Sequence, residues 1–167
     1  EGGVSTIAFK RNMSVGPNFD LRCGFDLTSE RDVQQVIDFI KRYRPFIVIM
    51  APPCTAFANW SHYNKVHAHE AWKRSYIIGL AIAKLCATVA QLQVRAQRHF
   101  VIENPRGSNL FTLPCFKQLW DTNPIICAID FPQCALGLQS PEGLPLLKWT
   151  TLWASSKYLT DPFAYLE

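Results

Sequence analysis

Hydrophobic residues recur along the chain with two spacings, one typical of strands and the other of helices. Residues 45–51 are almost all apolar and include three β-branched residues, and two prolines follow them. This run predicts a central strand buried on both faces. His99–Ile102 is a second short strand by the same criteria, and Pro124–Phe131 is apolar enough for a third. Leu144–Trp153 is typical of one arm of a hairpin.

Helical spacing dominates two other segments. Residues 30–43 predict an amphipathic helix, and residues 69–97 predict one long helix whose apolar stripe consists of Ile78, Ile82, Leu85, Val89 and Leu92. Thr6–Lys10 is a short amphipathic stretch, and Met13–Val15 is apolar enough for a short strand. Because helices alternate with strands, the pattern predicts an α/β fold.

Length and composition favour one domain over residues 1–167. The chain has 167 residues, of which 49% are hydrophobic, enough for a single core. It does not begin with Met, and Glu1-Gly2-Gly3 has the character of the end of a motif, so we expect a fragment. No apolar run reaches about 18 residues without a polar interruption, so we expect a soluble protein with no membrane segment.

Charge and cysteine content indicate which partners and which cellular compartment to expect. The net charge is +4, and a basic cluster follows the first predicted strand: Lys65, His67, His69, Lys73 and Arg74. Such a cluster suits a polyanion, although a solvated surface explains it equally well. The six cysteines form no C-x-x-C pair, so we expect reduced thiols in an intracellular compartment, the nucleus if the source is eukaryotic. No residues have metal-site spacing, and we expect no metal.

A short motif follows each of the first two predicted strands. Pro52-Pro53-Cys54 ends the first, and Glu103-Asn104-Pro105 ends the second. Open α/β sheets bind ligands at the carboxyl ends of their strands, so a nucleophile and an acid in these positions predict one shared site. The alternative for Cys54 is burial in the core, where free cysteines are common.

These two motifs, in this order, resemble the signature of the DNA cytosine-5 methyltransferases. The resemblance implies a Rossmann-like S-adenosylmethionine-dependent methyltransferase sheet with helices on both faces, its first strand missing or truncated here. It also implies that the Cys54 thiolate adds to carbon-6 of cytosine, while Glu103 contacts ring nitrogen 3 and the amino group. A similar arrangement occurs in methyltransferase-like segments of mobile-element polyproteins.

The resemblance implies S-adenosylmethionine as the cofactor. Gly2 and Gly3 match the end of the family's glycine-rich loop, although a simple turn explains a glycine pair as well. Asp26, just before the first long helix, matches the residue that accepts from the adenine amino group. Asp20 is the candidate for the ribose hydroxyls, or it simply ends a turn. Pro52 is expected beside the cofactor.

The resemblance implies a nucleic-acid substrate, with DNA as the first expectation and RNA as the alternative. The segment from Thr55 to Lys65 matches the family's mobile loop, which closes over an extruded base. The candidate substrate contacts are Phe57, Trp60, Lys65, Asn104 and Arg106. Phe131-Pro132-Gln133 faintly resembles a further family motif but lacks its arginines. Only about thirty residues separate Pro105 from Gln133, too few for the family's separate recognition domain.

Two other hypotheses remain open. The first is a degenerate methyltransferase fold that only binds nucleic acid or a partner chain, which the missing arginines and the positive charge favour. The second is another cysteine-nucleophile enzyme, such as a hydrolase, with His62, His67 or His69 as its base. No aspartate or asparagine is placed by the sequence to orient these histidines.

Overall fold

The computed structural model describes residues 3–166 and has a mixed α/β fold. The chain divides into two compact units, Glu1–Pro45 and Phe46–Glu167. The single domain expected over residues 1–167 stays a prediction. Each unit is described by itself below.

The first unit contains two helices and one short 3-10 turn: α1 (Gly3–Lys10), η1 (Leu21–Cys23) and α2 (Glu30–Tyr43). The periodicity predicted both bounds of α2. The strand expected at Met13–Val15 is wrong, because these residues are irregular. Phe19 organises the irregular segment, since its ring meets Phe25 and Phe39 edge-on at centroid distances of 5.0 and 5.3 Å.

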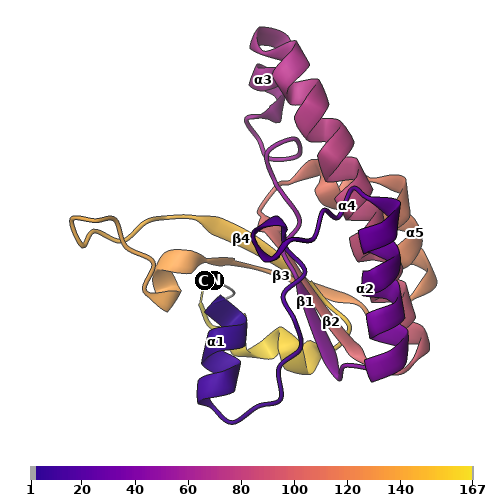
Figure 1. Ribbon diagram of the computed structural model, residues 1–167. Helices are drawn as coiled ribbons and strands as arrows, with labels where there is room; N and C mark the ends of the chain where they lie inside the picture. The colour runs from indigo at the N-terminus through magenta and orange to yellow at the C-terminus, as the bar shows by residue number, and fades with distance from the viewer. Residues whose placement is uncertain (1–2, 167) are drawn as a thin grey trace. The chain divides into compact units, whose positions relative to one another are not determined.

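The second unit is built on a four-stranded mixed sheet in the order β1-β2-β4-β3 (Figure 1). Its strands are β1 (Ile47–Met50), β2 (His99–Pro105), β3 (Cys127–Pro132) and β4 (Trp149–Ala154). β1 and β2 are parallel, and β4 is antiparallel to both of its neighbours. All four strands overlap predicted segments, and β2 continues three residues beyond the predicted His99–Ile102. The central, doubly buried position expected for β1 is wrong, because β1 is an edge strand of this sheet and Ile49 is half exposed.

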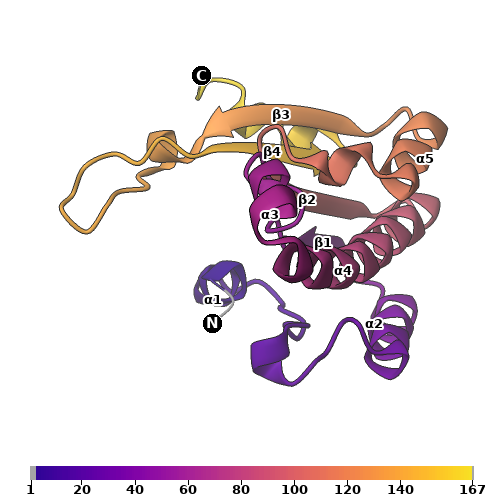
Figure 2. The ribbon, with the colours of Figure 1, turned by 90° about the horizontal axis from the view of Figure 1, so that it is seen from above.

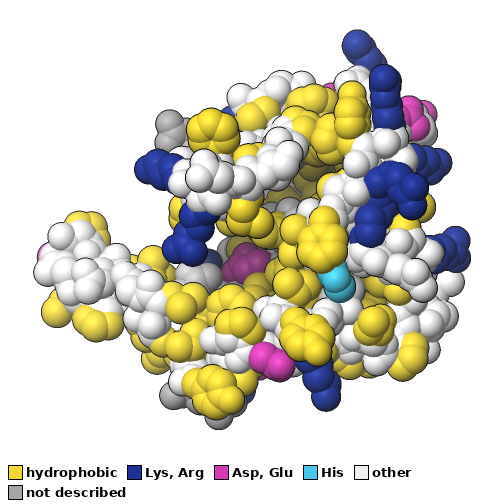
Figure 3. All heavy atoms as spheres, turned by 90° about the horizontal axis from the view of Figure 1, so that it is seen from below, with side chains coloured by type: hydrophobic (Ala, Val, Ile, Leu, Met, Phe, Trp, Pro, Cys, Tyr) yellow, Lys and Arg dark blue, Asp and Glu magenta, His cyan; other side chains and the backbone are white. Residues whose placement is uncertain are grey.

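Three helices connect the strands of this unit: α3 (Ser61–His67), α4 (His69–Arg95) and α5 (Pro114–Thr122). The unit also has four single 3-10 turns: η2 (Asn109–Thr112), η3 (Gln133–Leu136), η4 (Lys157–Leu159) and η5 (Asp161–Phe163). α4 and α5 lie on the same face of the sheet (Figure 2). The connection from β3 to β4 extends away from the sheet as an arm, on which hydrophobic side chains are exposed (Figure 3): Leu136, Leu144, Leu146 and Leu147.

The core of the second unit lies between the sheet and α4. Phe100 and Ile102 alternate along β2 toward the helices and are fully buried. α4 meets them with a face of small residues at helical spacing: Gly79, Ala83, Ala87 and Ala90. By length and composition α4 is also apolar enough to cross a membrane, a test that core helices pass as well. Here the buried face of α4 forms the core of the unit.

Gly79 is required by the close approach of Phe57. Phe57 follows the turn after β1, is 1% exposed and packs its ring on α4. A Cβ atom at position 79 would lie 2.8 Å from Cε2 of this ring, too close for an unstrained contact. The absence of a side chain at Gly79 therefore fixes how closely the segment after β1 packs on α4.

We expect Gly79→Ala to lower the free energy of unfolding by about 1 kcal/mol, because an overpacking cost of roughly 2 kcal/mol exceeds a helix-propensity gain of about 1 kcal/mol. Equilibrium urea denaturation measures this difference. In a Phe57→Leu background, where the ring is absent, the same substitution should be neutral or stabilising. An equal loss in both backgrounds would show that the contact with Phe57 is not the cause.

Candidate functional site

The parallel pairing of β1 and β2 brings their carboxyl ends to the same edge of the sheet. Met50, the last residue of β1, pairs with Ile102. The residues after β1 form the turn that contains Pro52-Pro53-Cys54, and the residues after Ile102 are Glu103 and Asn104. The strand β2 continues through both of these residues because β4 still pairs with them. The two motifs expected to share a site thus end adjacent strands.

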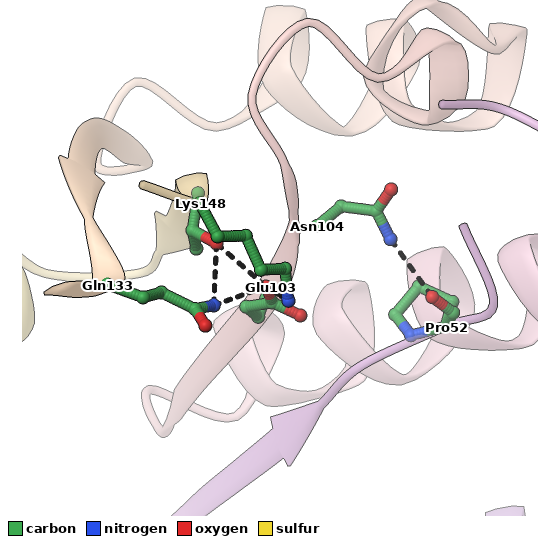
Figure 4. Close-up of polar contacts among 6 residues, drawn as sticks. Pro52, Glu103, Asn104, Gln133 and Lys148 are labelled. Carbon is green, nitrogen blue, oxygen red and sulfur yellow. Dashed lines mark hydrogen bonds and ion pairs between the residues drawn. The ribbon is translucent and has the colours of Figure 1, made fainter. Parts of the chain in front are cut away.

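A buried hydrogen bond joins the two motifs directly (Figure 4). Nδ2 of Asn104 donates to the carbonyl oxygen of Pro52 at 2.9 Å. Asn104 is 1% exposed, and Pro52 is also buried. The Oδ1 atom of Asn104 is buried and has no hydrogen-bond partner among residues 3–166. Asn104 was expected to contact a substrate, and its observed contact holds the turn that carries Cys54.

The turn at Cys54 is closed by backbone hydrogen bonds. The carbonyl of Cys54 accepts from the N–H groups of Phe57 and Ala58 at 2.9 and 2.8 Å. The carbonyl of Phe57 in turn accepts from the N–H of Asn109 at 2.8 Å, so the segment after β1 is tied to the segment after β2. Cys54 itself is partly exposed, which leaves its side chain accessible.

Glu103 lies on the face of the sheet opposite to Asn104, because successive residues of a strand point to opposite faces. Oε1 of Glu103 accepts from Oγ1 of Thr150 at 3.1 Å and from Nε2 of Gln133 at 3.4 Å. Nζ of Lys148 lies 3.9 Å from the same oxygen. Figure 4 shows Glu103 directed toward Gln133 and Lys148, and Asn104 directed toward Pro52.

Three residues around Glu103 were missed by the sequence reasoning as site residues. Gln133 lies in the segment that faintly resembles a family motif, which is the one signal that could have found it. Thr150 is fully buried on β4, and its hydroxyl also accepts from Gln133 at 2.7 Å. Lys148 precedes β4 and supplies a positive charge beside the carboxylate. Nothing local in the sequence marks Thr150 or Lys148.

Two of the expected substrate contacts have structural partners instead. Phe57 lies in the core, so in this structure its ring is not available to a ligand. Arg106 pairs with Asp130, with Nε to Oδ2 at 3.0 Å, and its guanidinium lies 4.7 Å from the ring centroid of Trp149. These three residues line an open hollow of about 570 Å³ together with Ala128 and Ile129.

The other two expected contacts lie on the surface. Trp60 is 76% exposed, and Nζ of Lys65 lies 5.2 Å from the ring centroid of Trp72. The loop expected from Thr55 to Lys65 ends at Trp60, because α3 begins at Ser61. The ring of His67 packs on the ring of Tyr63, and their centroids are 4.2 Å apart. His69 Nδ1 lies 3.3 Å from the carbonyl oxygen of Lys65.

The expected cofactor residues of the first unit have local roles. Asp20 caps η1, because its Oδ1 accepts from the N–H of Arg22 at 2.8 Å. Oδ1 of Asp26 accepts from the hydroxyl and the N–H of Thr28 at 2.6 and 2.9 Å. The Thr28 hydroxyl, followed by its backbone N–H, lowers the pKa of Asp26 from its usual 3.8. Gly3 begins α1, and Gly2 lies outside the described residues.

No protein-family model matches this chain, and no curated protein or solved structure matches it either. The functional assignment therefore depends on the residues and contacts of the chain itself.

We expect Asn104→Leu to lower the free energy of unfolding by about 1–3 kcal/mol, because it leaves the buried carbonyl of Pro52 without its donor. It should also speed alkylation of Cys54 by iodoacetamide, measured by peptide mass spectrometry under native conditions, because the turn is no longer held. Asn123→Leu is the matched control, since Asn123 is also buried and donates to the carbonyl of Leu119. Equal alkylation rates in the two variants would contradict the positioning role of Asn104.

We expect Thr28→Val to raise the pKa of Asp26 toward 3.8, because the variant lacks the hydroxyl that stabilises the carboxylate. A carboxyl group with a lowered pKa stabilises the fold above its unfolded pKa, and this contribution is lost as the pH falls through the folded pKa. Carboxyl NMR titration measures the change. Thr28→Ser keeps the hydroxyl and should leave the pKa near that of the wild type.

Proposed function

We propose that this chain is the catalytic domain of an S-adenosylmethionine-dependent methyltransferase acting on carbon-5 of cytosine in DNA. One observation carries the proposal: the hydrogen bond from Asn104 to Pro52 joins the Pro-Pro-Cys turn to the Glu-Asn strand at adjacent strand ends. The parallel pair β1 and β2, connected through the helices α3 and α4, supports the Rossmann-like fold that the proposal requires.

Cys54 is the proposed nucleophile. Carbon-5 of cytosine becomes nucleophilic only after a thiolate adds to carbon-6, so the reaction requires a cysteine that the base can reach. Cys54 is partly exposed and lies in a turn held at two points. Cys86 provides the contrast, because burial raises its pKa to about 12 and leaves it without thiolate at neutral pH.

Glu103 is the proposed acid. Its Oε1 is held by Thr150 and Gln133. In the proposed reaction the carboxyl group contacts ring nitrogen 3 and the amino group of the cytosine. A proton shared with nitrogen 3 offsets the negative charge that develops when the Cys54 sulfur bonds to carbon-6. Lys148 stabilises the carboxylate that remains. After methylation the carbon-5 proton passes to solvent water and the shared proton returns to Glu103, so the carbon-6 to sulfur bond breaks and Cys54 leaves as a thiolate.

The residues of the first unit fit the proposed cofactor. Asp20 and Asp26 are exposed, and their local hydrogen bonds engage Oδ1 of each side chain. The second oxygen of each carboxylate is therefore suited to accept from a hydroxyl or an amino group. When bound, S-adenosylmethionine supplies the electrophilic methyl group.

A second candidate is a binding module without methyl transfer. It is favoured by the observation that Arg106 and Phe57, both expected at the substrate, are engaged in an ion pair and in core packing. Such a module would still bind nucleic acid but would form no covalent bond to it.

Covalent trapping separates the two candidates. The protein is incubated with S-adenosylmethionine and DNA containing 5-fluorocytosine, which cannot lose a proton from carbon-5. We expect an adduct that mass spectrometry maps to Cys54, and we expect none with Cys54→Ser. Cys23→Ser is the control, because Cys23 is an exposed cysteine outside the proposed site. We further expect Glu103→Gln to slow methyl transfer to unmodified DNA by about 10²- to 10⁴-fold. An adduct that survives Cys54→Ser would refute the proposal.

A further inference from the structure

The excess positive charge of the chain is concentrated in one segment. Residues 55–97 contain five lysines and arginines and a single acidic residue, Glu70. Their net charge of +4 equals that of the whole chain, so the remaining residues are balanced, with 12 basic and 12 acidic side chains. A surface with excess positive charge attracts a polyanion.

The amino-terminal end of this segment extends beyond the core. α4 has 27 residues, and the first of its buried residues is Gly79. At about 1.5 Å per residue the helix is roughly 40 Å long, whereas a seven-residue strand such as β2 spans only about 23 Å. α3 packs against α4. α3 and the first turns of α4 lie clear of the sheet (Figure 1). These two helical segments, residues 60–76, are called the projection below.

Aromatic rings form a row along the exposed side of the projection. Trp60, the residue before α3, is spaced by three and four residues from Tyr63 and His67, so the three lie on one side of this segment. The ring centroids of Trp60 and Tyr63 are 6.5 Å apart, and those of Tyr63 and His67 are 4.2 Å apart. Trp60 is 76% and Tyr63 is 57% exposed. Large exposed aromatic side chains in a row are typical of a binding surface.

Cations flank this aromatic row. Lys65 lies over the ring of Trp72, which itself stacks on Tyr76 at a centroid distance of 5.1 Å. Lys73 and Arg74 are exposed on the next turn of α4. The projection therefore combines flat rings for stacking with ammonium and guanidinium groups for phosphates. Stacked bases are worth about 1–3 kcal/mol each, and every base offers a face to stack.

We propose that the projection binds single-stranded nucleic acid. Unpaired bases stack on Trp60 and Tyr63, while Lys65, Lys73 and Arg74 contact the phosphates. A duplex binds less tightly because its base faces are already stacked within the helix. The inference rests on the proposed function only in that a single strand would also present an unpaired cytosine to Cys54.

Fluorescence anisotropy without S-adenosylmethionine tests the inference, with labelled oligothymidylate and a duplex of the same length as probes. We expect tighter binding of the single strand. Trp60→Ala and Tyr63→Ala should each weaken it about 5-fold or more, the loss expected when one stacked base is released. Tyr158→Ala is the matched control, because Tyr158 is 88% exposed on η4, and it should leave binding unchanged.

Salt dependence and one further variant complete the test. Lys73→Gln should reduce the slope of log affinity against log salt by about 0.7, as expected when one phosphate contact to a single strand is removed. The single-stranded probe contains no cytosine and the assay contains no S-adenosylmethionine, so a failed trapping experiment and a failed binding experiment are distinguishable. The inference is overturned if the duplex binds as tightly as the single strand. It is also overturned if Trp60→Ala and Tyr63→Ala bind like the wild type, or if these substitutions abolish self-association of the protein and not nucleic-acid binding.

Discussion

The candidate site depends on the hydrogen bond between the Asn104 side chain and the carbonyl of Pro52. The bond lies in the interior, where an unpaired carbonyl costs about 1–3 kcal/mol, so the turn is strongly biased toward the one position that satisfies it. Parallel pairing of β1 with β2 brings the two segments within reach. The side chain then fixes the turn, and with it the backbone of Cys54, relative to the strand that carries Glu103.

Alternation along β2 gives neighbouring residues separate tasks. Glu103, Thr150 and Leu152 share one face of the sheet, while Asn104, Thr151 and Asp130 share the other, as the strand register requires. On the face that carries Asn104, the side chains hold the Pro-Pro-Cys turn and the core. On the other, Thr150, Gln133 and Lys148 converge on the carboxylate of Glu103. A residue that positions the nucleophile can therefore follow directly after the proposed acid.

The long helix α4 also serves two purposes along its length. Its second part presents small residues to the sheet, which allows Phe57 to pack against Gly79 and brings the segment after β1 close to the core. Its first turns carry charge and aromatic rings beyond the sheet. Because both parts belong to one continuous helix, the exposed surface is held rigidly relative to the core of the same unit.

The sequence by itself determined the local elements and the two motifs. Periodicity predicted α2 with its bounds, α4 to within two residues at its end, and segments that overlap all four strands. These features follow from local spacing, since a helix or a strand repeats its buried positions over a few residues. The order of Pro-Pro-Cys and Glu-Asn along the chain likewise predicted that a cysteine and a glutamate would end adjacent strands.

Only the tertiary structure decided the edge position of β1, the burial of Phe57 and the partners of Glu103. The apolar stripe predicted for α4 is buried at Leu85 and Val89, but it also includes Ile78, which is half exposed. The buried face further carries alanines and a glycine, whose small size gives no hydrophobic signal. Thr150 and Lys148 reach Glu103 across more than forty residues of chain, through a strand pairing that no local pattern encodes. Long-range pairing selects the partners of a side chain, and therefore the chemistry available to it.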